Sequence, residues 1–468
     1  MAGLFQVFFW LSRDNLVTLN ENSFEKIESL SYSPFEGYDK NLLSSEQIAY
    51  DVNLFENFTN KLRTYGTLEA YKILQSSKDS NLPIDLGLWI GGDLEANNLE
   101  IQRALEILKE YPNRIQSVIV GNEVLLRKEL EPLELYAYID FMKSHTKKPV
   151  TTAETWDIWE KNPQLASHVD FLTIHILPYW EKVPIERYNE FIIEKYSVVE
   201  ELFPNRKIVI GETGWPSHGY NNNSAIPSIK NQAQAIRGFV NLAHEKGWHY
   251  NIIEALDQPW KGYDEGNVGQ YWGIFTTDRA LKFQLAGEVE LNKYWLYQMI
   301  AAIIIGALLT LFGLKNQRVN ISHAFAYAIA AQGMAFGIVM AAIYPFVNYM
   351  NFGMWIMWGM GSFLMIPLVI ITLAKANELF RSSIGVQPSR LVPLDLKSKN
   401  APLVSIHVPA YKEQPHVLAE TLESLSKLTY PNYEVLVIIN NTPEDFYKTP
   451  IKELCEKLGD KFKYLDIK

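Results

Sequence analysis

Eight short apolar runs between residues 29 and 285 restrict the fold of this chain more than any other feature of its sequence. Most of them are separated by stretches of helical periodicity, such as NLEIQRALEILKEYP and NQAQAIRGFVNLAHEKG. Alternating strands and helices predict a parallel sheet, and eight such units in about 250 residues favour an α/β fold of the closed (β/α)8 TIM barrel type. An open, doubly wound sheet is the alternative, but no Gly-x-Gly-x-x-Gly motif follows the first run. The expected strands are SLSYSP, KLRTYG, IDLGLWIGG, SVIVGNE, KPVTTAE, DFLTIHI, KIVIGE and NIIEALDQ.

Three long apolar segments follow the barrel, at about 294–314, 322–347 and 352–376. The first would be about 31 Å long as a helix, which is enough to cross a bilayer. Buried core helices are the alternative, but three successive segments of this length favour transmembrane helices. The loop after the first segment is basic, the third segment exits into Lys375 and Arg381, and the loop NYMN between the second and third is uncharged. The positive-inside rule therefore predicts a multi-pass membrane protein with an extracytoplasmic barrel and a cytoplasmic C-terminal segment.

The two ends of the chain form further segments. Residues 1–28 include LFQVFFWL, which is too short to span a bilayer. We interpret it as the stub of an anchor rather than as a buried edge of the barrel. Residues 401–468 have the pattern strand, loop, helix and strand, the opening of a Rossmann-like α/β nucleotide-binding fold. About 70 residues are too few for such a domain, so we expect a fragment of a longer protein.

Composition excludes several classes of function. The formal net charge of −10 argues against a nucleic-acid partner, which would need a basic face. Cys455 is the only cysteine, so no intrachain disulfide can form. Because no cluster of cysteine and histidine has the spacing of metal ligands, no metal site is expected.

Two glutamates stand at the ends of apolar runs. Glu123 in SVIVGNEVLLR ends the fourth expected strand, and Glu212 in KIVIGETGWPSHG ends the seventh. Strand ends of a barrel converge on one rim, where two carboxylates are the minimal equipment for cleaving a glycosidic bond. One carboxyl must be protonated to donate to the leaving oxygen, and the other must be ionised to attack the anomeric carbon. We expect partial burial and mutual repulsion to separate their pKa values in this sense.

Aromatic residues gather at the same expected strand ends, where flat rings can stack on the apolar faces of sugars. Asn122, next to Glu123, can donate to a sugar 2-hydroxyl. His175 lies inside an apolar strand, and we interpret it as a satisfied barrel histidine rather than a ligand. The aromatic residues are Trp89, Trp156, Tyr179, Trp180, Trp215, Trp260 and Trp272.

VGNEVLLR and IVIGETGWPSHG resemble the acid/base and nucleophile motifs of family 17 glycoside hydrolases, the β-1,3-glucanase family, and LSYSPF, LRTYG, LPYW and EALDQPWK resemble its strand ends. The resemblance implies a retaining mechanism without a cofactor, in which Glu123 is the general acid/base and Glu212 the nucleophile. Glu254 and Lys261 either contact substrate or pair with each other. The candidate substrate-binding residues are Tyr65, Asn122, Tyr179, Trp215, Glu254, Trp260 and Lys261.

VSIHVPAYKE resembles the first strand and nucleotide-contacting loop of family 2 glycosyltransferases, which implies that Glu413 approaches the uridine diphosphate of a donor sugar. The sequence departs from that family at VIINNTPED, because an aspartate is usual near Ile439 or Asn440. UDP-sugar and a divalent metal therefore belong only to a complete transferase domain, and we expect no transferase activity here. The order of the segments resembles bacterial β-glucan synthases.

The sequence thus predicts four segments and one leading function. The function is a membrane-anchored retaining hydrolase or transglycosylase that acts on β-1,3-glucan outside the cytoplasm, with β-glucan polysaccharides or oligosaccharides and the lipid bilayer as partners. One alternative is a polymer-synthesising glycosyltransferase to which the barrel is an accessory. Another is a non-catalytic barrel that guides glucan, although both carboxylates are present. The segments are 1–28, the barrel at 29–285, three transmembrane helices within 294–376, and the transferase fragment at 401–468.

Overall fold

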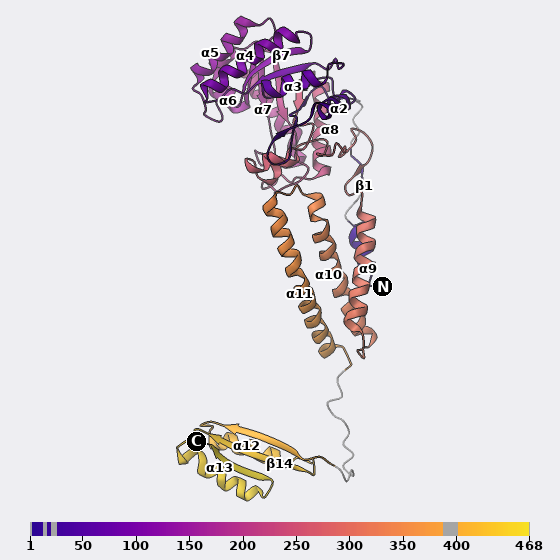
Figure 1. Ribbon diagram of the computed structural model, residues 1–468, viewed down its shortest axis with the longest axis vertical. Helices are drawn as coiled ribbons and strands as arrows, with labels where there is room; N and C mark the ends of the chain where they lie inside the picture. The colour runs from indigo at the N-terminus through magenta and orange to yellow at the C-terminus, as the bar shows by residue number, and fades with distance from the viewer. Residues whose placement is uncertain (1, 13–15, 20–25, 387–400, 468) are drawn as a thin grey trace. The chain divides into compact units, whose positions relative to one another are not determined.

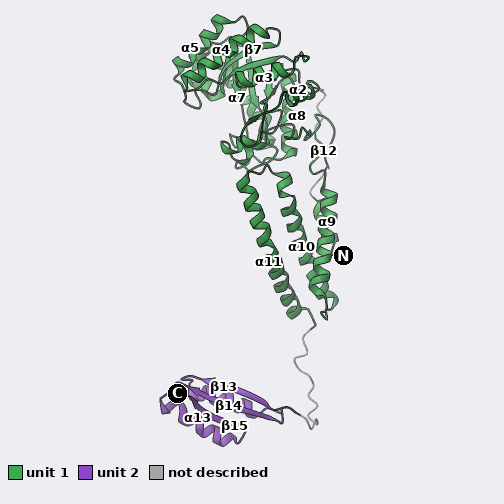
Figure 2. Ribbon diagram, in the orientation of Figure 1, with its two compact units in different colours: residues 1–385 green, residues 386–468 purple. Residues whose placement is uncertain are grey.

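The computed structural model describes residues 2–12, 16–19, 26–386 and 401–467. It divides into two compact units, residues 1–385 and residues 386–468 (Figure 2). The first unit holds the barrel and the long apolar helices, and the second holds the C-terminal segment.

Within the described residues, eight parallel strands close into a barrel in the order β10-β11-β2-β5-β6-β7-β8-β9 (Figure 1). Each of the eight predicted runs overlaps one strand, so the barrel is confirmed and the open sheet is excluded. The ring closes where Ile252 of β11 pairs with Leu30 of β2. The strands are β2 (Leu30–Ser31), β5 (Leu62–Arg63), β6 (Ile84–Leu88), β7 (Ile115–Asn122), β8 (Val150–Thr155), β9 (Leu172–His175), β10 (Ile208–Thr213) and β11 (His249–Ile252).

Helices with one apolar face cover the outside of the barrel. Ile101, Ala104 and Ile107 of α4 are buried at helical spacing. The side chain of Asp93 accepts hydrogen bonds from the first backbone amides of this helix, which begins it. The helices are α2 (Ser45–Glu56), α3 (Thr67–Ser76), α4 (Leu94–Glu110), α5 (Pro132–His145), α6 (Trp156–Lys161), α7 (Tyr188–Leu202) and α8 (Ile229–Lys246).

Short elements complete the barrel. Two pairs of antiparallel strands lie outside the ring, and four 3-10 turns lie in its loops within the described residues. The paired strands are β1 (Leu16–Val17) with β12 (Val289–Glu290), and β3 (Phe35–Glu36) with β4 (Asn41–Leu42). The turns are η1 (Pro163–Ser167), η2 (Ile185–Arg187), η3 (Pro259–Tyr263) and η4 (Asn267–Tyr271).

In the described part of the chain, three helices are long and apolar enough to cross a membrane. They are α9 (Trp295–Leu314), α10 (Ile321–Val347) and α11 (Phe352–Ser383), and the last runs past the predicted end at residue 376. The short helix α1 (Leu4–Leu11) packs against α9 and α10. Its Gln6 side chain donates to the backbone oxygen of Gln332 at 2.7 Å, and the rings of Phe9 and Phe336 are 4.5 Å apart. The N-terminal apolar segment therefore joins the long helices and not the barrel.

The loop between α10 and α11 is bound to the barrel through Tyr349. The Tyr349 hydroxyl donates to Asp257 Oδ2 at 2.9 Å, and its ring stacks on Tyr271 with centroids 5.0 Å apart. Its backbone oxygen accepts from the hydroxyl of Tyr38 at 2.6 Å. The uncharged loop and the barrel thus lie at the same end of the helices.

The second unit is a parallel sheet in the order β13-β14-β15 with two helices packed on it. The predicted strand, helix and strand are confirmed as β13 (Val404–Ala410), α12 (Pro415–Ser426) and β14 (Tyr433–Asn440). The sequence analysis did not predict the next helix and strand, α13 (Asp445–Leu458) and β15 (Phe462–Ile467). Buried Val435, Val437 and Ile439 of β14 form the centre of its core.

Candidate active site

Glu123 and Glu212 lie at the carboxyl ends of two barrel strands, as predicted. Glu212 belongs to β10, and Glu123 directly follows β7, the seventh and fourth barrel strands along the chain. Gly121 and Glu123 both have positive φ angles, +83° and +55°, which turn the chain sharply after β7. A positive φ costs a residue with a Cβ on the order of 1 kcal/mol or more. The fold therefore holds Glu123 in a backbone conformation that it would not adopt by preference.

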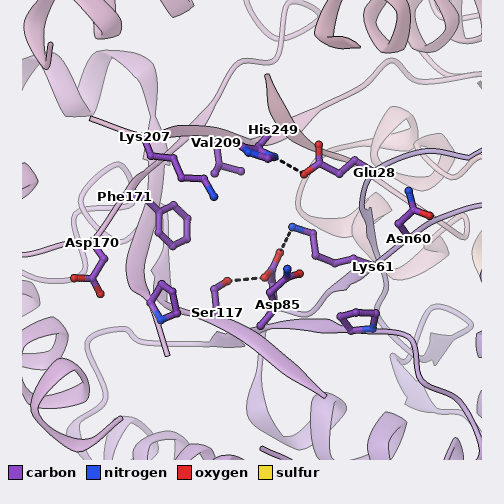
Figure 3. Close-up of a pocket in the computed structure, with 13 residues that line it drawn as sticks. Glu28, Asn60, Lys61, Asp85, Ser117, Asp170, Phe171, Lys207, Val209 and His249 are labelled. Atoms are coloured by element: carbon purple, nitrogen blue, oxygen red, sulfur yellow. Dashed lines mark hydrogen bonds and ion pairs between the residues drawn. The ribbon is translucent and has the colours of Figure 1, made fainter. Parts of the chain in front are cut away.

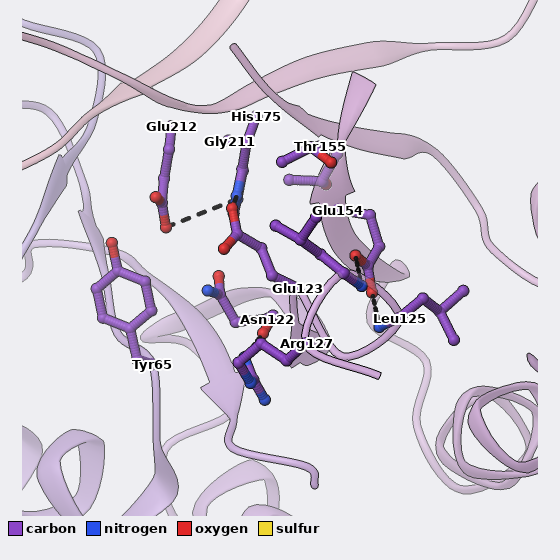
Figure 4. A network of polar contacts seen from close by, with 12 residues as sticks. Tyr65, Asn122, Glu123, Leu125, Arg127, Glu154, Thr155, His175, Gly211 and Glu212 are labelled. Atoms are coloured by element: carbon purple, nitrogen blue, oxygen red, sulfur yellow. Dashed lines mark hydrogen bonds and ion pairs between the residues drawn. The ribbon is translucent and has the colours of Figure 1, made fainter. Parts of the chain in front are cut away.

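The two carboxylates meet at one histidine (Figure 4). His175 Nδ1 is 2.7 Å from Glu123 Oε1, and His175 Nε2 is 3.6 Å from Glu212 Oε1. One oxygen of each carboxylate and one nitrogen of His175 all lie within 4.8 Å of one another. Retaining glycosidases hold their carboxyl groups about 5–5.5 Å apart, and inverting enzymes about 6.5–9.5 Å. The nearest oxygens of Glu123 and Glu212 are closer to the retaining distance than to the inverting one.

Arg63 of β5 lies between the two glutamates and was not singled out from the sequence. Its buried guanidinium is 3.5 Å from Glu212 Oε1 and donates to Asn122 Oδ1 at 2.7 Å. The side chain of Asn122 therefore uses its oxygen in this contact, and its amide nitrogen is the donor that could meet a sugar hydroxyl. The guanidinium offsets part of the negative charge that Glu123 and Glu212 bring together at His175. The sequence did offer a sign of this role, because Arg63 is a charged residue inside the short expected strand KLRTYG.

The pKa of Glu123 is lowered, whereas the sequence analysis expected burial and the second carboxylate to raise it and keep the acid protonated. Burial by itself would raise this pKa, but the hydrogen bond and the electrostatic interaction with His175, together with the charges of Arg127 and Arg63, lower it below its usual value. The expectation was wrong for Glu123 because it counted the second carboxylate and left out the donors from neighbouring strands.

Glu154, at the end of β8, holds the turn that carries Glu123. Its fully buried carboxylate accepts from the backbone amides of Leu125 at 2.7 Å and Leu126 at 3.3 Å. Burial raises the pKa of Glu154 to about 7, against the effect of these hydrogen bonds. The sequence analysis placed Glu154 at a strand end but gave it no role, although its position matches that of Glu123.

Glu254 and Lys261 pair with each other, one of the two alternatives that the sequence left open. Lys261 Nζ donates to Glu254 Oε1 at 2.8 Å, and both side chains are buried. Burial raises the pKa of Glu254 to about 7, and Lys261 opposes this. Glu265, which the sequence did not indicate, is a further carboxyl near the pair: burial raises its pKa, Lys261 lowers it, and the charges of Glu212 and Glu123 raise it further. Tyr65 donates to Ser31 Oγ at 2.9 Å.

The aromatic residues at the strand ends separate into two groups. Tyr179 and Trp215 are completely buried, and the hydroxyl of Tyr179 donates to the backbone oxygen of Tyr220. Their rings therefore offer no surface to a sugar in this structure. Trp260 is half-buried with Lys40 4.2 Å from its ring, and Trp89 is 46% exposed. A strand-end position alone could not distinguish core rings from exposed rings.

Glu413 lies in the loop after β13 and is exposed, as the sequence predicted for the PAYKE segment. The neighbouring Lys412 pairs with Glu444 at 2.8 Å. Ile439 is buried in the core of the sheet, so its side chain offers no polar group to a nucleotide base.

Figure 3 shows a cavity of about 560 Å³ among the starts of the barrel strands. Glu123 and Glu212 lie at the other ends of their strands. Residues that begin the strands line the cavity, and its charges largely neutralise each other. Lys61 pairs with Asp85 at 2.8 Å, and His249 pairs with Glu28 at 2.9 Å. The amino ends of barrel strands serve stability rather than catalysis, so we do not place the substrate there.

A closed barrel with two carboxylates meeting at the carboxyl ends of its strands has the equipment of a glycoside-cleaving enzyme. Comparison with known proteins gives the family. The chain belongs to the BtgE/BtgC glycoside hydrolase domain family, whose model matches residues 29–273, and residues 405–468 match glycosyl transferase family 2.

Relatives and solved structures agree with this assignment. A glucan 1,3-beta-glucosidase of Schizosaccharomyces pombe is 27% identical over 255 residues, 50% of this chain and 79% of that protein. A glucan 1,3-beta-glucosidase of Saccharomyces cerevisiae is 24% identical, over 52% of this chain and 85% of that protein. A glycoside hydrolase family 17 beta-1,3-glucanosyltransferase from Rhizomucor miehei, known from its crystal structure, is 25% identical in sequence. The two structures match with a TM-score of 0.50 over 54% of this chain and 94% of that one. The barrel is therefore a family 17 domain, of the glycoside hydrolase or transglycosylase class.

Proposed function

We propose that this chain is a membrane-anchored retaining enzyme that cleaves β-1,3-glucan at the barrel rim and transfers the glycosyl group to water or to a sugar hydroxyl. Glu212 is the nucleophile and Glu123 the general acid/base. The observation that carries the proposal is the short separation of the two carboxylates, within 4.8 Å at their nearest oxygens.

The geometry supports these two roles. Glu212 Oε1 makes no hydrogen bond to any described residue, while Arg63 places a positive charge 3.5 Å away. An oxygen of the Glu212 carboxylate attacks the anomeric carbon as Glu123 protonates the leaving oxygen. In the second step an acceptor loses its proton to Glu123 and displaces Glu212, which restores the original anomeric configuration. The mechanism uses no cofactor.

The substrate is proposed from the relatives, which are named for β-1,3-glucan. Tyr65, Asn122 and Trp260 are the proposed subsite residues, and the buried pair Glu254 and Lys261 is left out. We do not include Tyr179 and Trp215, because both are buried.

The long helices support a membrane anchor, with the barrel outside the cytoplasm and residues 401–468 inside. Basic residues at the end of the helices away from the barrel support this orientation. A second candidate function is a contribution to glucan synthesis, and the match of residues 405–468 to glycosyl transferase family 2 favours it. In that case the barrel would process or guide a polymer made by a complete transferase domain.

Glu212→Gln and Glu123→Gln test the proposal with laminari-oligosaccharides as substrates. Glu212→Gln should reduce kcat by roughly a thousandfold or more while leaving oligosaccharide binding largely intact. Glu95→Gln, on the exposed first turn of α4, is the matched control and should leave kcat unchanged. Products longer than the substrate would identify transfer, and shorter products alone would identify hydrolysis. Turnover of Glu212→Gln near the wild-type rate would contradict the assignment.

A further inference from the structure

The contact between Arg63 and His175 determines where His175 carries its proton. Both terminal nitrogens of the Arg63 guanidinium lie 3.3 Å from His175 Nε2. A guanidinium can only donate hydrogen bonds, so Nε2 is the unprotonated, accepting nitrogen of the ring. The N–H of the ring that faces Glu123 is therefore on Nδ1, where it donates to Glu123 Oε1 at 2.7 Å.

Charged groups from four other barrel strands or their ends lie around His175. Arg63 approaches from β5, Glu123 follows β7, Glu154 comes from β8 and Glu212 from β10.

Gly211 provides the space for this contact. A Cβ at position 211 would lie 3.1 Å from both Arg63 Nη1 and His175 Cδ2, and 2.4 Å from Thr173 Cγ2. Any larger residue would therefore push against the two side chains. Arg63 is fixed in addition by hydrogen bonds to the backbone oxygen of Gly211 and to Asn122.

We propose that His175, whose Nε2 accepts from Arg63, is a positioning residue that binds Oε1 of Glu123 through Nδ1 and so reserves Oε2 for the proton that is transferred. The inference rests on the proposed function, in which Glu123 is the acid/base. In the first step Glu123 Oε2 gives its proton to the leaving oxygen as the glycosidic bond breaks and an oxygen of Glu212 bonds to the anomeric carbon. In the second step Oε2 takes the proton of the acceptor as the bond to Glu212 breaks. His175 keeps its own proton throughout.

The hydrogen bond from His175 has a consequence for pH dependence. It stabilises the carboxylate of Glu123 more than the neutral acid, in agreement with the lowered pKa of this group. Glu123 therefore loses its transferable proton at a lower pH than it would without His175. The alkaline limb of kcat/KM reports that loss, so it should move to higher pH when the donor is removed.

Two amide variants separate the two nitrogens of His175. In His175→Asn the amide nitrogen can occupy the place of Nδ1 and still donate to Glu123. In His175→Gln the longer side chain can accept from Arg63 at the place of Nε2 but cannot reach Glu123 as a donor. His168→Asn is the matched control, since His168 also pairs with a carboxylate, Asp140 at 2.9 Å, but lies outside the site.

The measurement is kcat/KM against pH for the full chain in detergent, with laminari-oligosaccharides. We expect the alkaline limb of His175→Gln to move up by about one pH unit or more. The limbs of His175→Asn and His168→Asn should stay at the wild-type position. An unmoved limb in His175→Gln, or equal shifts in His175→Gln and His175→Asn, would overturn the inference.

An aryl glucoside whose leaving group needs no proton distinguishes this inference from the proposed function. Glu123→Gln should regain glycosidic cleavage with this substrate if Glu123 is the acid. If it does not, the proposed function itself is wrong. If it does and the limb of His175→Gln has not moved, only the role of His175 is wrong.

Discussion

Replacing Glu154 by glutamine tests how the turn behind Glu123 is held, and its effect should depend on pH. Burial raises the pKa of Glu154 from 4.5 to about 7 in the folded protein. Because the folded state binds this proton more tightly than the unfolded state, the stabilisation is fully present below pH 4.5 and is lost as the pH rises through 7. The pKa difference of about 2.5, from 4.5 to about 7, corresponds to about 3 kcal/mol of unfolding free energy.

Glutamine cannot ionise, but its carbonyl oxygen can still accept from the backbone amide of Leu125. The free energy of unfolding of Glu154→Gln, relative to wild type, should therefore rise by about 3 kcal/mol between pH 5 and pH 8. Urea titrations of the full chain in detergent, followed by tryptophan fluorescence, measure this difference. Glu95→Gln is the exposed control and should show no such change. An equal difference between Glu154→Gln and wild type at both pH values would refute the reasoning.

Three further predictions concern the other segments. Tyr349→Phe removes the donor to buried Asp257 and should lower the unfolding free energy of the barrel by about 1–3 kcal/mol in the same titration, whereas Tyr50→Phe, on the exposed side of α2, should not. In a Cys455→Ser background, a membrane-impermeant thiol reagent applied to intact cells should label a cysteine at position 95 but not one at position 316, and the reverse would overturn the predicted orientation. Calorimetry with UDP-glucose and a divalent metal should detect no binding, and a dissociation constant in the micromolar range, about −8 kcal/mol, would contradict our interpretation of residues 401–468.

The barrel and the positions of the two glutamates followed from local sequence. Runs such as SVIVGNE and KIVIGE have the apolar, β-branched composition of buried parallel strands, and a closed ring brings all their carboxyl ends to one rim. The glutamates at those ends could therefore be placed together without knowledge of any contact.

The rest of the site depends on contacts between strands that are far apart in sequence. Arg63 belongs to a strand of two residues, β5, and reaches Glu212 only because the barrel is closed. The direction of the Glu123 pKa depends on His175 and Arg63 together, and no spacing within one segment predicts it. Tyr179 and Trp215 follow strands as exposed rings would, but their burial is decided by the loops that cover them.

The C-terminal helix α13 could not be predicted from its own sequence either. It contains Pro450, which usually marks the end of a helix, yet Ile451 and Cys455 beyond it are buried on one face. Packing against the sheet therefore keeps this segment helical, although Pro450 would favour ending the helix.

Trapping the covalent intermediate tests the central claim most directly. A 2-deoxy-2-fluoro laminaribiosyl fluoride should react with the enzyme and add one glycosyl mass to the peptide that contains Glu212, because a retaining enzyme forms an ester with its nucleophile. Glu212→Gln should remain unlabelled under the same conditions. A label on a peptide without Glu212, or products with inverted anomeric configuration and no label, would contradict the account.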